Sequence, residues 1–314
     1  MSAADAPSGF DAFFGREIAP WITDQEVERQ ALMRRVALRG GPLLVLGVVV
    51  AIVGFLDYPS EDMGAVLVLV GFALAAGGLA LFYPLFKWGN AFKVELSARI
   101  FGHFGYVYAS RPPAGFFEPF RQARIVPRHH RRRLEDHVTG LVGNVRFELA
   151  EAHLEVEHKR KDHTVHVTVF RGLIARYDFP KRFAGRTTVR ADMGAIGNRL
   201  GHSGVEGDRV RLESATFEKA FEVFSTDQVE ARYLLTPAFM ERMLELKVHA
   251  PGGLQAAFMD DHLWLLIDAQ RDLFCRPSLW RDLRRSGHVE ELIADIQLIG
   301  EIARVLRLDA QTAV

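Results

Sequence analysis

The sequence predicts an α+β protein that begins with a transmembrane helical hairpin and continues into a cytoplasmic domain of antiparallel strands and amphipathic helices. The hairpin is indicated by two uncharged apolar runs, Gly40–Leu56 and Met63–Phe86, with the acidic segment Asp57–Asp62 between them. From Leu141 to Tyr177 apolar and polar residues alternate, as in half-buried strands. The segment from His288 to Leu308 has apolar residues at helical spacing. Strands and helices in separate runs are typical of an α+β domain.

The chain has 314 residues, more than one ordinary domain needs. We expect a leader and amphipathic helix over 1–35, the helical hairpin over 36–88, and the cytoplasmic α+β domain over 89–314. Thr23–Glu26 has the pattern of a capping box and predicts a helix start after a polar and aromatic leader. Ser110–Gly115 contains two prolines and a glycine, which interrupt any helix.

The two apolar runs have the length of membrane spans. About 20 apolar residues cross a hydrocarbon core of roughly 30 Å, so Met63–Phe86 spans it comfortably. Gly40–Leu56 requires Arg39 to extend its charged head to the interface. A buried hairpin in a soluble core is the alternative. A cleaved signal peptide fits less well because the first run begins far from Met1 and a second run follows at once.

The distribution of charge predicts the orientation of the hairpin. Its acidic turn contains no Lys or Arg, whereas basic residues flank both runs. They are Arg29, Arg34, Arg35 and Arg39 before the first run, and Lys87, Lys93 and Arg99 after the second. Since flanking Lys and Arg stay on the cytoplasmic side, we expect both termini in the cytoplasm and the turn outside.

Glycines recur at the same interval in both runs. They are Gly40, Gly47 and Gly54 in the first run, and Gly64, Gly71 and Gly78 in the second. Residues seven apart share one helical face, and small residues let two backbones approach closely in lipid. We therefore expect a tight helix pair in which Gly54 lies level with Gly64, Gly47 with Gly71, and Gly40 with Gly78. The alternative is that glycine is simply common in membrane helices.

Local signals place the later elements. The charged segment Lys159–Asp162 predicts a turn between two strands, and Thr187–Ala191 a further short strand. Thr236 before Pro237 has the pattern of an N-cap followed by the first helical residue. Asp260–Asp261, between two apolar runs, predicts a hairpin turn. The five glycines of Gly194–Gly207 lie in a polar run without the context of a phosphate loop, and we interpret them as a loop.

Composition excludes several function classes. The formal net charge is zero, so no electrostatic argument favours nucleic acid as a partner. The single cysteine, Cys275, excludes an internal disulfide framework and fits a reducing cytoplasm. Phosphate-binding loops, zinc motifs and nucleophile elbows are absent from the sequence, so we expect no cofactor and lean away from an enzyme.

A family resemblance adds to this interpretation. Phe217–Met240, which reads FEKAFEVFSTDQVEARYLLTPAFM, resembles the bacterial family known as domain of unknown function 3137. Glu135–Gly140 and Val169–Leu173 resemble two further segments of it, and the similarity runs from about Arg34 to Asp268. The resemblance implies a bacterial membrane protein with a cytoplasmic domain, hence an inner-membrane location with two spans. It implies no activity and no site residues.

Two groups of residues are candidate sites. The most basic segment could contact anionic head groups, at about 1 kcal/mol per charge near the surface, or could be a solvated loop. Its residues are Arg128, Arg131, Arg132 and Arg133, with Glu135 and Asp136 following. The second group could bind a divalent metal. It comprises Glu151, His153 and Glu155 on one strand face, with His163 and His166 on the partner strand, only one of which can join that face. The alternative is an ordinary polar outer face whose acids pair with Lys159–Lys161.

We therefore expect an uncharacterised binding or scaffolding module tethered to the inner membrane. Its partners would be the lipid bilayer and a protein at the inner leaflet. The alternative is a membrane-anchored, metal-dependent hydrolase that uses the face of Glu151, His153 and Glu155.

Overall fold

The chain forms two compact units. The helical unit comprises Met1–Arg99 and Cys275–Val289, and the sheet unit comprises Ile100–Phe274 and Glu290–Val314. The expected break between 88 and 89 falls within α4 (Tyr83–His103), which continues from the first unit into the second. The computed structural model describes residues 10–56, 63–159, 164–179, 181–191, 206–248, 250–285 and 287–311.

The helical unit begins earlier than the sequence predicts. Helix is continuous through α1 (Phe10–Phe13), the π-helical η2 (Phe14–Ile18) and α2 (Ala19–Leu56). The predicted capping box at Thr23–Glu26 is therefore wrong, because the Thr23 hydroxyl donates to the Ala19 carbonyl at 2.9 Å inside the helix. Buried apolar side chains of the leader, including Phe10 and Ile18, extend the helix toward the N-terminus.

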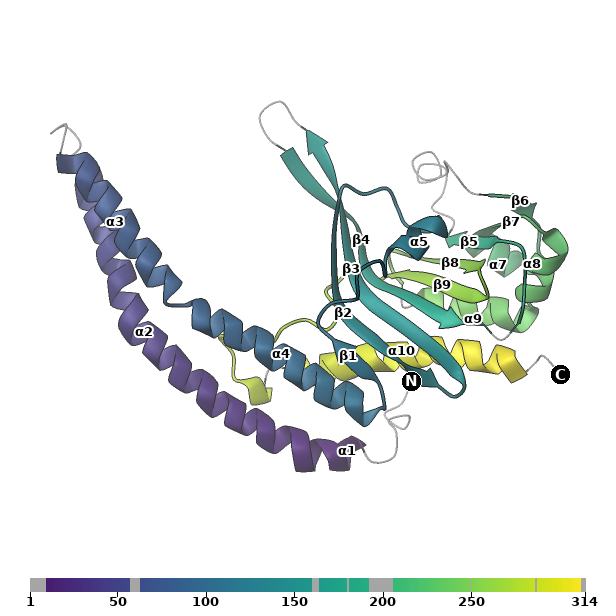
Figure 1. Ribbon diagram of the computed structural model, residues 1–314, viewed down its shortest axis with the longest axis horizontal. Coiled ribbons are helices and arrows are strands. Elements are labelled where there is room, and N and C mark those ends of the chain that lie inside the picture. Colours follow the sequence, from purple (N-terminus) through teal and green to yellow (C-terminus); the bar gives the residue numbers. More distant parts are fainter. Residues whose placement is uncertain are drawn as a thin grey trace. The chain divides into compact units, whose positions relative to one another are not determined.

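The first apolar run forms the C-terminal part of α2, and the second forms α3 (Met63–Ala80) and the start of α4. Helices α2 and α3 pack together (Figure 1). The structure places the six glycines on this seam, where all of them are buried: Gly40, Gly47, Gly54, Gly64, Gly71 and Gly78. The helices Phe10–Leu56 and Met63–His103 are long and apolar enough to cross a membrane, and only 17% and 11% of their apolar windows are buried. The acidic turn lies outside the described residues.

The segment Cys275–Val289 is tied to α2 by a buried ion pair. Arg29 donates to Glu26 through two bonds, of 2.9 and 2.7 Å, and to the Leu279 carbonyl at 2.6 Å. Glu26 in turn accepts from the Leu283 backbone N–H at 3.1 Å. These contacts place a segment that was expected in the cytoplasmic domain within the helical unit.

The described part of the sheet unit contains a nine-stranded antiparallel sheet of order β1-β2-β3-β4-β9-β8-β5-β7-β6 (Figure 1). Its strands are β1 (Val107–Ala109), β2 (Arg131–Val142), β3 (Val145–Lys159), β4 (Thr164–Asp178), β5 (Thr187–Ala191), β6 (Asp208–Val210), β7 (Phe221–Ser225), β8 (Gly253–Met259) and β9 (His262–Asp268). Its helices are α5 (Glu118–Gln122), α7 (Ala215–Ala220), α8 (Gln228–Leu234), α9 (Pro237–Val248) and α10 (His288–Gln311). The predicted α+β class is confirmed.

Several local predictions hold in this unit. Thr236 caps α9, since its hydroxyl accepts from the Phe239 N–H at 3.3 Å. Asp260 and Asp261 connect β8 to β9 with φ of 54° and 58°, the left-handed values of a tight hairpin turn. Strand β2 begins at Arg131, inside the basic segment for which a solvated loop is the alternative to head-group contact.

One face of the sheet is covered by α5 and its flanking loops. Phe116, Phe117 and Phe120 pack there with Ala150, Ala152 and Leu154 of β3 and with other buried residues of one core cluster. Alternation along β3 directs Phe147, Leu149 and Glu151 to the opposite face. Alternate residues of β3 therefore lie in two different environments, one on each face of the sheet.

Candidate functional site

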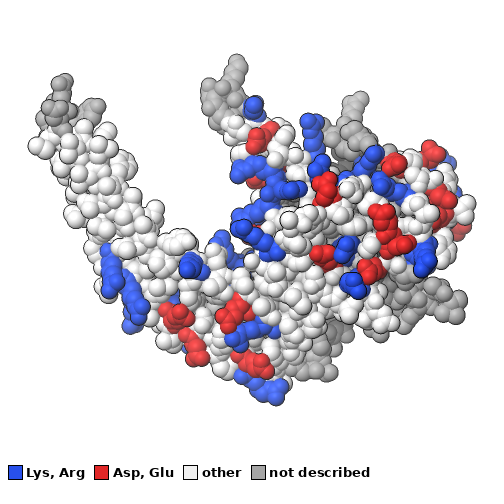
Figure 2. All heavy atoms as spheres, viewed as in Figure 1, with Lys and Arg blue, Asp and Glu red and all other residues white. Residues whose placement is uncertain are grey.

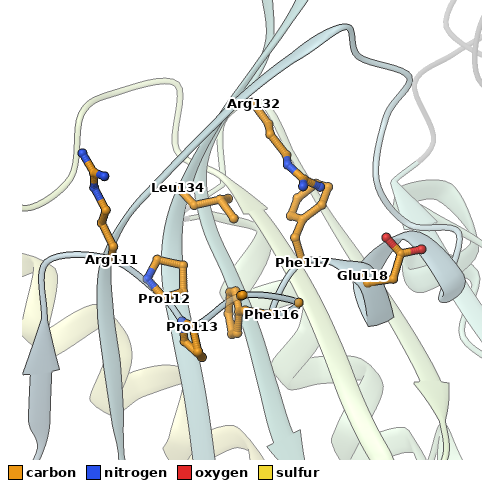
Figure 3. Close-up of a pocket in the computed structure, with 10 residues that line it drawn as sticks. Arg111, Pro112, Pro113, Phe116, Phe117, Glu118, Arg132 and Leu134 are labelled. Carbon is orange, nitrogen blue, oxygen red and sulfur yellow. The ribbon is translucent and has the colours of Figure 1, made fainter.

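A hollow of about 220 Å³ lies between the loop that precedes α5 and the start of β2 (Figure 3). Its lining combines cationic and apolar side chains with one acid. The lining residues are Arg111, Pro112, Pro113, Ala114, Gly115, Phe116, Phe117, Glu118, Arg132 and Leu134. Small-ligand sites combine apolar walls with a few polar groups, and this open hollow has an apolar base with a few charged side chains around it.

The base of the hollow is held in place by the core. Phe116 contacts Phe120 at 5.3 Å between ring centroids, and Phe117 contacts His129 at 5.5 Å. The loop above them turns through Gly115, whose φ of 87° favours glycine, and Glu118 N–H donates to the Gly115 carbonyl at 3.0 Å. These contacts fix the loop against the sheet, so the hollow is largely preformed.

Two arginines stand on either side of the hollow, with Leu134 between them (Figure 3). The Arg132 guanidinium lies over the Phe117 ring, 5.0 Å from its centroid. Within the described residues neither Arg111 nor Arg132 forms an ion pair, whereas Glu118 pairs with Arg121 at 3.1 Å. Because guanidinium groups donate in a planar fork, this arrangement favours a phosphate or carboxylate above an apolar base.

The strand geometry divides the basic segment between the two faces of the sheet. Arg132 lies opposite Leu154 and points to the hollow's side, whereas Arg131 and Arg133 lie opposite Glu155 and His153. Arg133 also pairs with Glu135 at 2.8 Å. Figure 2 shows basic side chains on the side of the sheet unit from which β3 and β4 project, with acidic ones among them. Of the four candidate arginines, only Arg132 lines the hollow.

The carboxylate and imidazole side chains on this face of β3 contact their neighbours in pairs. His153 lies 2.8 Å from the Thr168 hydroxyl and 3.8 Å from Glu155, and His166 lies 3.9 Å from Glu157. His163 lies outside the described residues. Within the described residues, no three His, Cys, Asp or Glu side chains form a group that could hold a metal ion.

Glu151 is separated from that polar face by burial. It is 5% exposed, its Oε1 accepts from the Leu273 N–H at 3.2 Å, and its Oε2 has no hydrogen-bond partner among the described residues. Burial, together with the neighbouring Asp272 carboxylate, raises the pKa of Glu151 to about 9. Glu151 is therefore protonated at neutral pH, a form that neither binds a metal well nor acts as a base.

The sequence analysis does not predict the hollow. The sequence predicts only a helix break and a boundary at Ser110–Gly115, although the aromatic pair Phe116–Phe117 after it indicates a loop anchored in a core. The glycine loop from Gly194 falls almost entirely outside the described residues, and only its last member, Gly207, is described, with φ of 90°.

The comparison with protein families concerns the C-terminal half of the chain. Residues 168–308 match the model of a family described as "Protein of unknown function (DUF3137)". These residues belong to that family. The DUF3137 region includes strands β5 to β9, and it begins later than the expected Arg34 and continues beyond Asp268. Both apolar helices and the hollow precede it.

Among solved structures, the mycobacterial trehalose monomycolate transport factor A, TtfA, is similar to this chain, with 10% sequence identity and a TM-score of 0.31. The similarity covers 65% of this chain and 90% of that one. At this TM-score it supports no further conclusion. No curated protein matches the chain.

Proposed function

We propose that this protein is a binding module tethered to the bacterial inner membrane by α2 and α3, with both termini in the cytoplasm. The observation that supports the tether is the contrast between the two sides of the helix pair. Glycines fill the seam, whereas Val45, Phe55 and Leu69 are 60%, 74% and 70% exposed on the outside. Such side chains are unfavourable in water and are solvated well by lipid tails.

The orientation is tested with paired reporters. A cytoplasmic reporter fused after Val314 should be active, and a reporter that works only outside the cytoplasm should be active when inserted between Leu56 and Met63. Activity of the external reporter after Val314 would overturn the orientation. Recovery of the full chain in the soluble fraction, without detergent, would overturn the tether itself.

We further propose that the hollow binds the anionic head group of a phospholipid. Arg111 and Arg132 supply two guanidinium groups for one phosphate, and Phe116, Phe117 and Leu134 supply an apolar surface for the adjoining carbons. A lipid fits better than an acidic peptide because the cationic groups are few and stand directly above an apolar base. The tether also keeps the module at the surface that contains such lipids.

A soluble, short-chain phosphatidylglycerol tests this binding on the full chain in neutral detergent. It should raise the melting temperature, whereas the zwitterionic phosphatidylcholine analogue should not. The double variant Arg111→Gln, Arg132→Gln should lose the shift, and the exposed Arg146→Gln of β3 should keep it. An equal shift with inorganic phosphate would identify free phosphate as the ligand, and a shift that survives the double variant would exclude the hollow.

A further inference from the structure

The segment Cys275–Leu283, which we call the tryptophan loop, is fixed to both long helices of the helical unit. Leu279 packs directly against α4, since a Cβ atom on Gly89 would lie only 2.6 Å from the Leu279 Cδ2 atom. On the side of α2, the Arg29 guanidinium donates to the Leu279 carbonyl at 2.6 Å. The loop is therefore held at a fixed level along the two helices that lead into the apolar runs.

That level lies close to the end of the apolar helix pair. The pair ends where Gly40 meets Phe82, whose ring would lie 3.2 Å from a Cβ atom on Gly40. Gly89 follows Phe82 by seven residues, and Met33, whose Sδ accepts from the Arg29 guanidinium at 2.8 Å, precedes Gly40 by seven. At 1.5 Å per helical residue, both helices put the loop about 10 Å from the apolar pair. In the tethered arrangement proposed above, this is the outer edge of the cytoplasmic head groups, a layer about 5–8 Å deep.

The exposed side of the tryptophan loop suits this level. Trp280 is 64% exposed, in a turn in which the Arg281 N–H donates to the Ser278 carbonyl at 3.4 Å. Phe86 precedes Gly89 by three residues, so it shares that face of α4, and it is 47% exposed. The lipid-facing surface of the second apolar run thus continues through Phe86 toward the loop. Tryptophan is enriched at membrane interfaces because one end of its ring system is apolar and the other donates a hydrogen bond.

The charges around Trp280 also match a membrane surface. The segment 275–285 contains four arginines but only one acid, which pairs with Arg284 at 2.7 Å. Arg276 and Arg281 are exposed on either side of Trp280. Anionic lipids of the cytoplasmic leaflet attract such residues near the surface. An acidic partner protein would attract them too, but the tether already holds the bilayer at this level.

We propose that the tryptophan loop is a third membrane contact, in which Trp280 inserts among the head groups of the cytoplasmic leaflet while Arg276 and Arg281 bind anionic head groups. The proposal rests on the tether formed by α2 and α3, and it adds a segment far away in the sequence. It is separate from the hollow, which belongs to the sheet unit. Interfacial Trp and Arg residues set the tilt and rotation of membrane helices, so this contact orients the helical unit in the bilayer.

Lipid-depth quenching on the full chain in vesicles of phosphatidylglycerol and phosphatidylcholine tests the contact. In a Cys275→Ser background, a fluorescent label is attached to Ser278→Cys, an exposed position of the loop, and a lipid with a nitroxide head group is the quencher. The matched control is a label on Val27→Cys, which is 66% exposed on α2 but about 20 Å from the apolar run. Quenching at Ser278→Cys should be several-fold stronger than at Val27→Cys. Adding Trp280→Ser should remove most of this difference, and vesicles of phosphatidylcholine alone should weaken it.

A label on Val45→Cys separates failure of this contact from failure of the tether. Val45 is 60% exposed within the first apolar run, so a nitroxide deep in the acyl chains should quench a label there. Quenching at Val45→Cys, with equal quenching at Ser278→Cys and Val27→Cys, would overturn the loop contact alone. Absence of quenching at Val45→Cys would refute the tether and the loop contact with it. A difference that survives Trp280→Ser would contradict the insertion of Trp280.

Discussion

The carbonyl oxygen of Gly71 lies only 2.7 Å from the position that a Cβ atom on Gly47 would occupy. Gly47→Ala should therefore force α2 and α3 apart and lower the stability of the hairpin by about 1–3 kcal/mol. Gly41 on the same helix has nothing within 4 Å of its Cβ position. Gly41→Ala should be neutral, or stabilising by up to about 1 kcal/mol through helix propensity. Thermal unfolding in detergent distinguishes the two, and equal shifts would contradict the seam.

The buried pair of Arg29 and Glu26 should be coupled strongly. Their side chains are 6% and 3% exposed, so removal of either one leaves a buried charge without its partner. We expect Arg29→Leu or Glu26→Leu to lower stability by about 3–5 kcal/mol, and the double variant to lose much less than the sum. A double-mutant cycle of chemical unfolding measures this coupling. Additive losses would mean that the pair does not act as a unit.

Glu151 should make the stability of the sheet unit depend on pH. Burial raises the pKa of Glu151 to about 9 from 4.5, while the Leu273 N–H opposes that rise. Below about pH 4.5 both folded and unfolded states hold the proton. Between that pH and about 9 only the unfolded state releases it, so stability falls as pH rises through this window.

Glu151→Gln removes this dependence. The variant should be more stable than the wild type by roughly 1–3 kcal/mol at pH 8, and the difference should shrink toward pH 4.5. Unfolding midpoints of the full chain across this range provide the measurement, with Glu155→Gln, a partly exposed carboxylate of the same strand, as the matched control. A difference that stays constant with pH would show that Glu151 does not hold its proton in the fold.

The turn between β8 and β9 should be improved by glycine. Both central residues adopt positive φ, and the second position of such a turn favours Gly. Asp261→Gly should raise stability by a few tenths to about 1 kcal/mol, since it loses only a long bond of 3.4 Å from the Phe183 N–H. Asp261→Val should lower stability instead. Matching thermal shifts for both variants would exclude backbone strain at this position.

Features that depend only on residues adjacent in the chain could be predicted from the sequence alone. The Thr236 cap, the Asp260–Asp261 turn and the strand Thr187–Ala191 each follow from residues adjacent in the chain, and the structure has all three. The capping box at Thr23–Glu26 failed for a related reason. A capping signal identifies a helix start only when no earlier residues continue the helix, and buried Phe10 and Ile18 do so here.

The sequence by itself determined the two apolar helices, their glycine spacing and the α+β class, because the period of a helix or strand fixes which residues share a face. Tertiary structure alone decided that Arg132 joins Arg111 at a hollow while Arg131 and Arg133 lie on the other face. It also decided that Glu151 is buried and neutral while Glu155, on the same strand face, is partly exposed. The physical reason is that desolvation and charge proximity depend on which distant segments cover a strand, and periodicity carries no information about that.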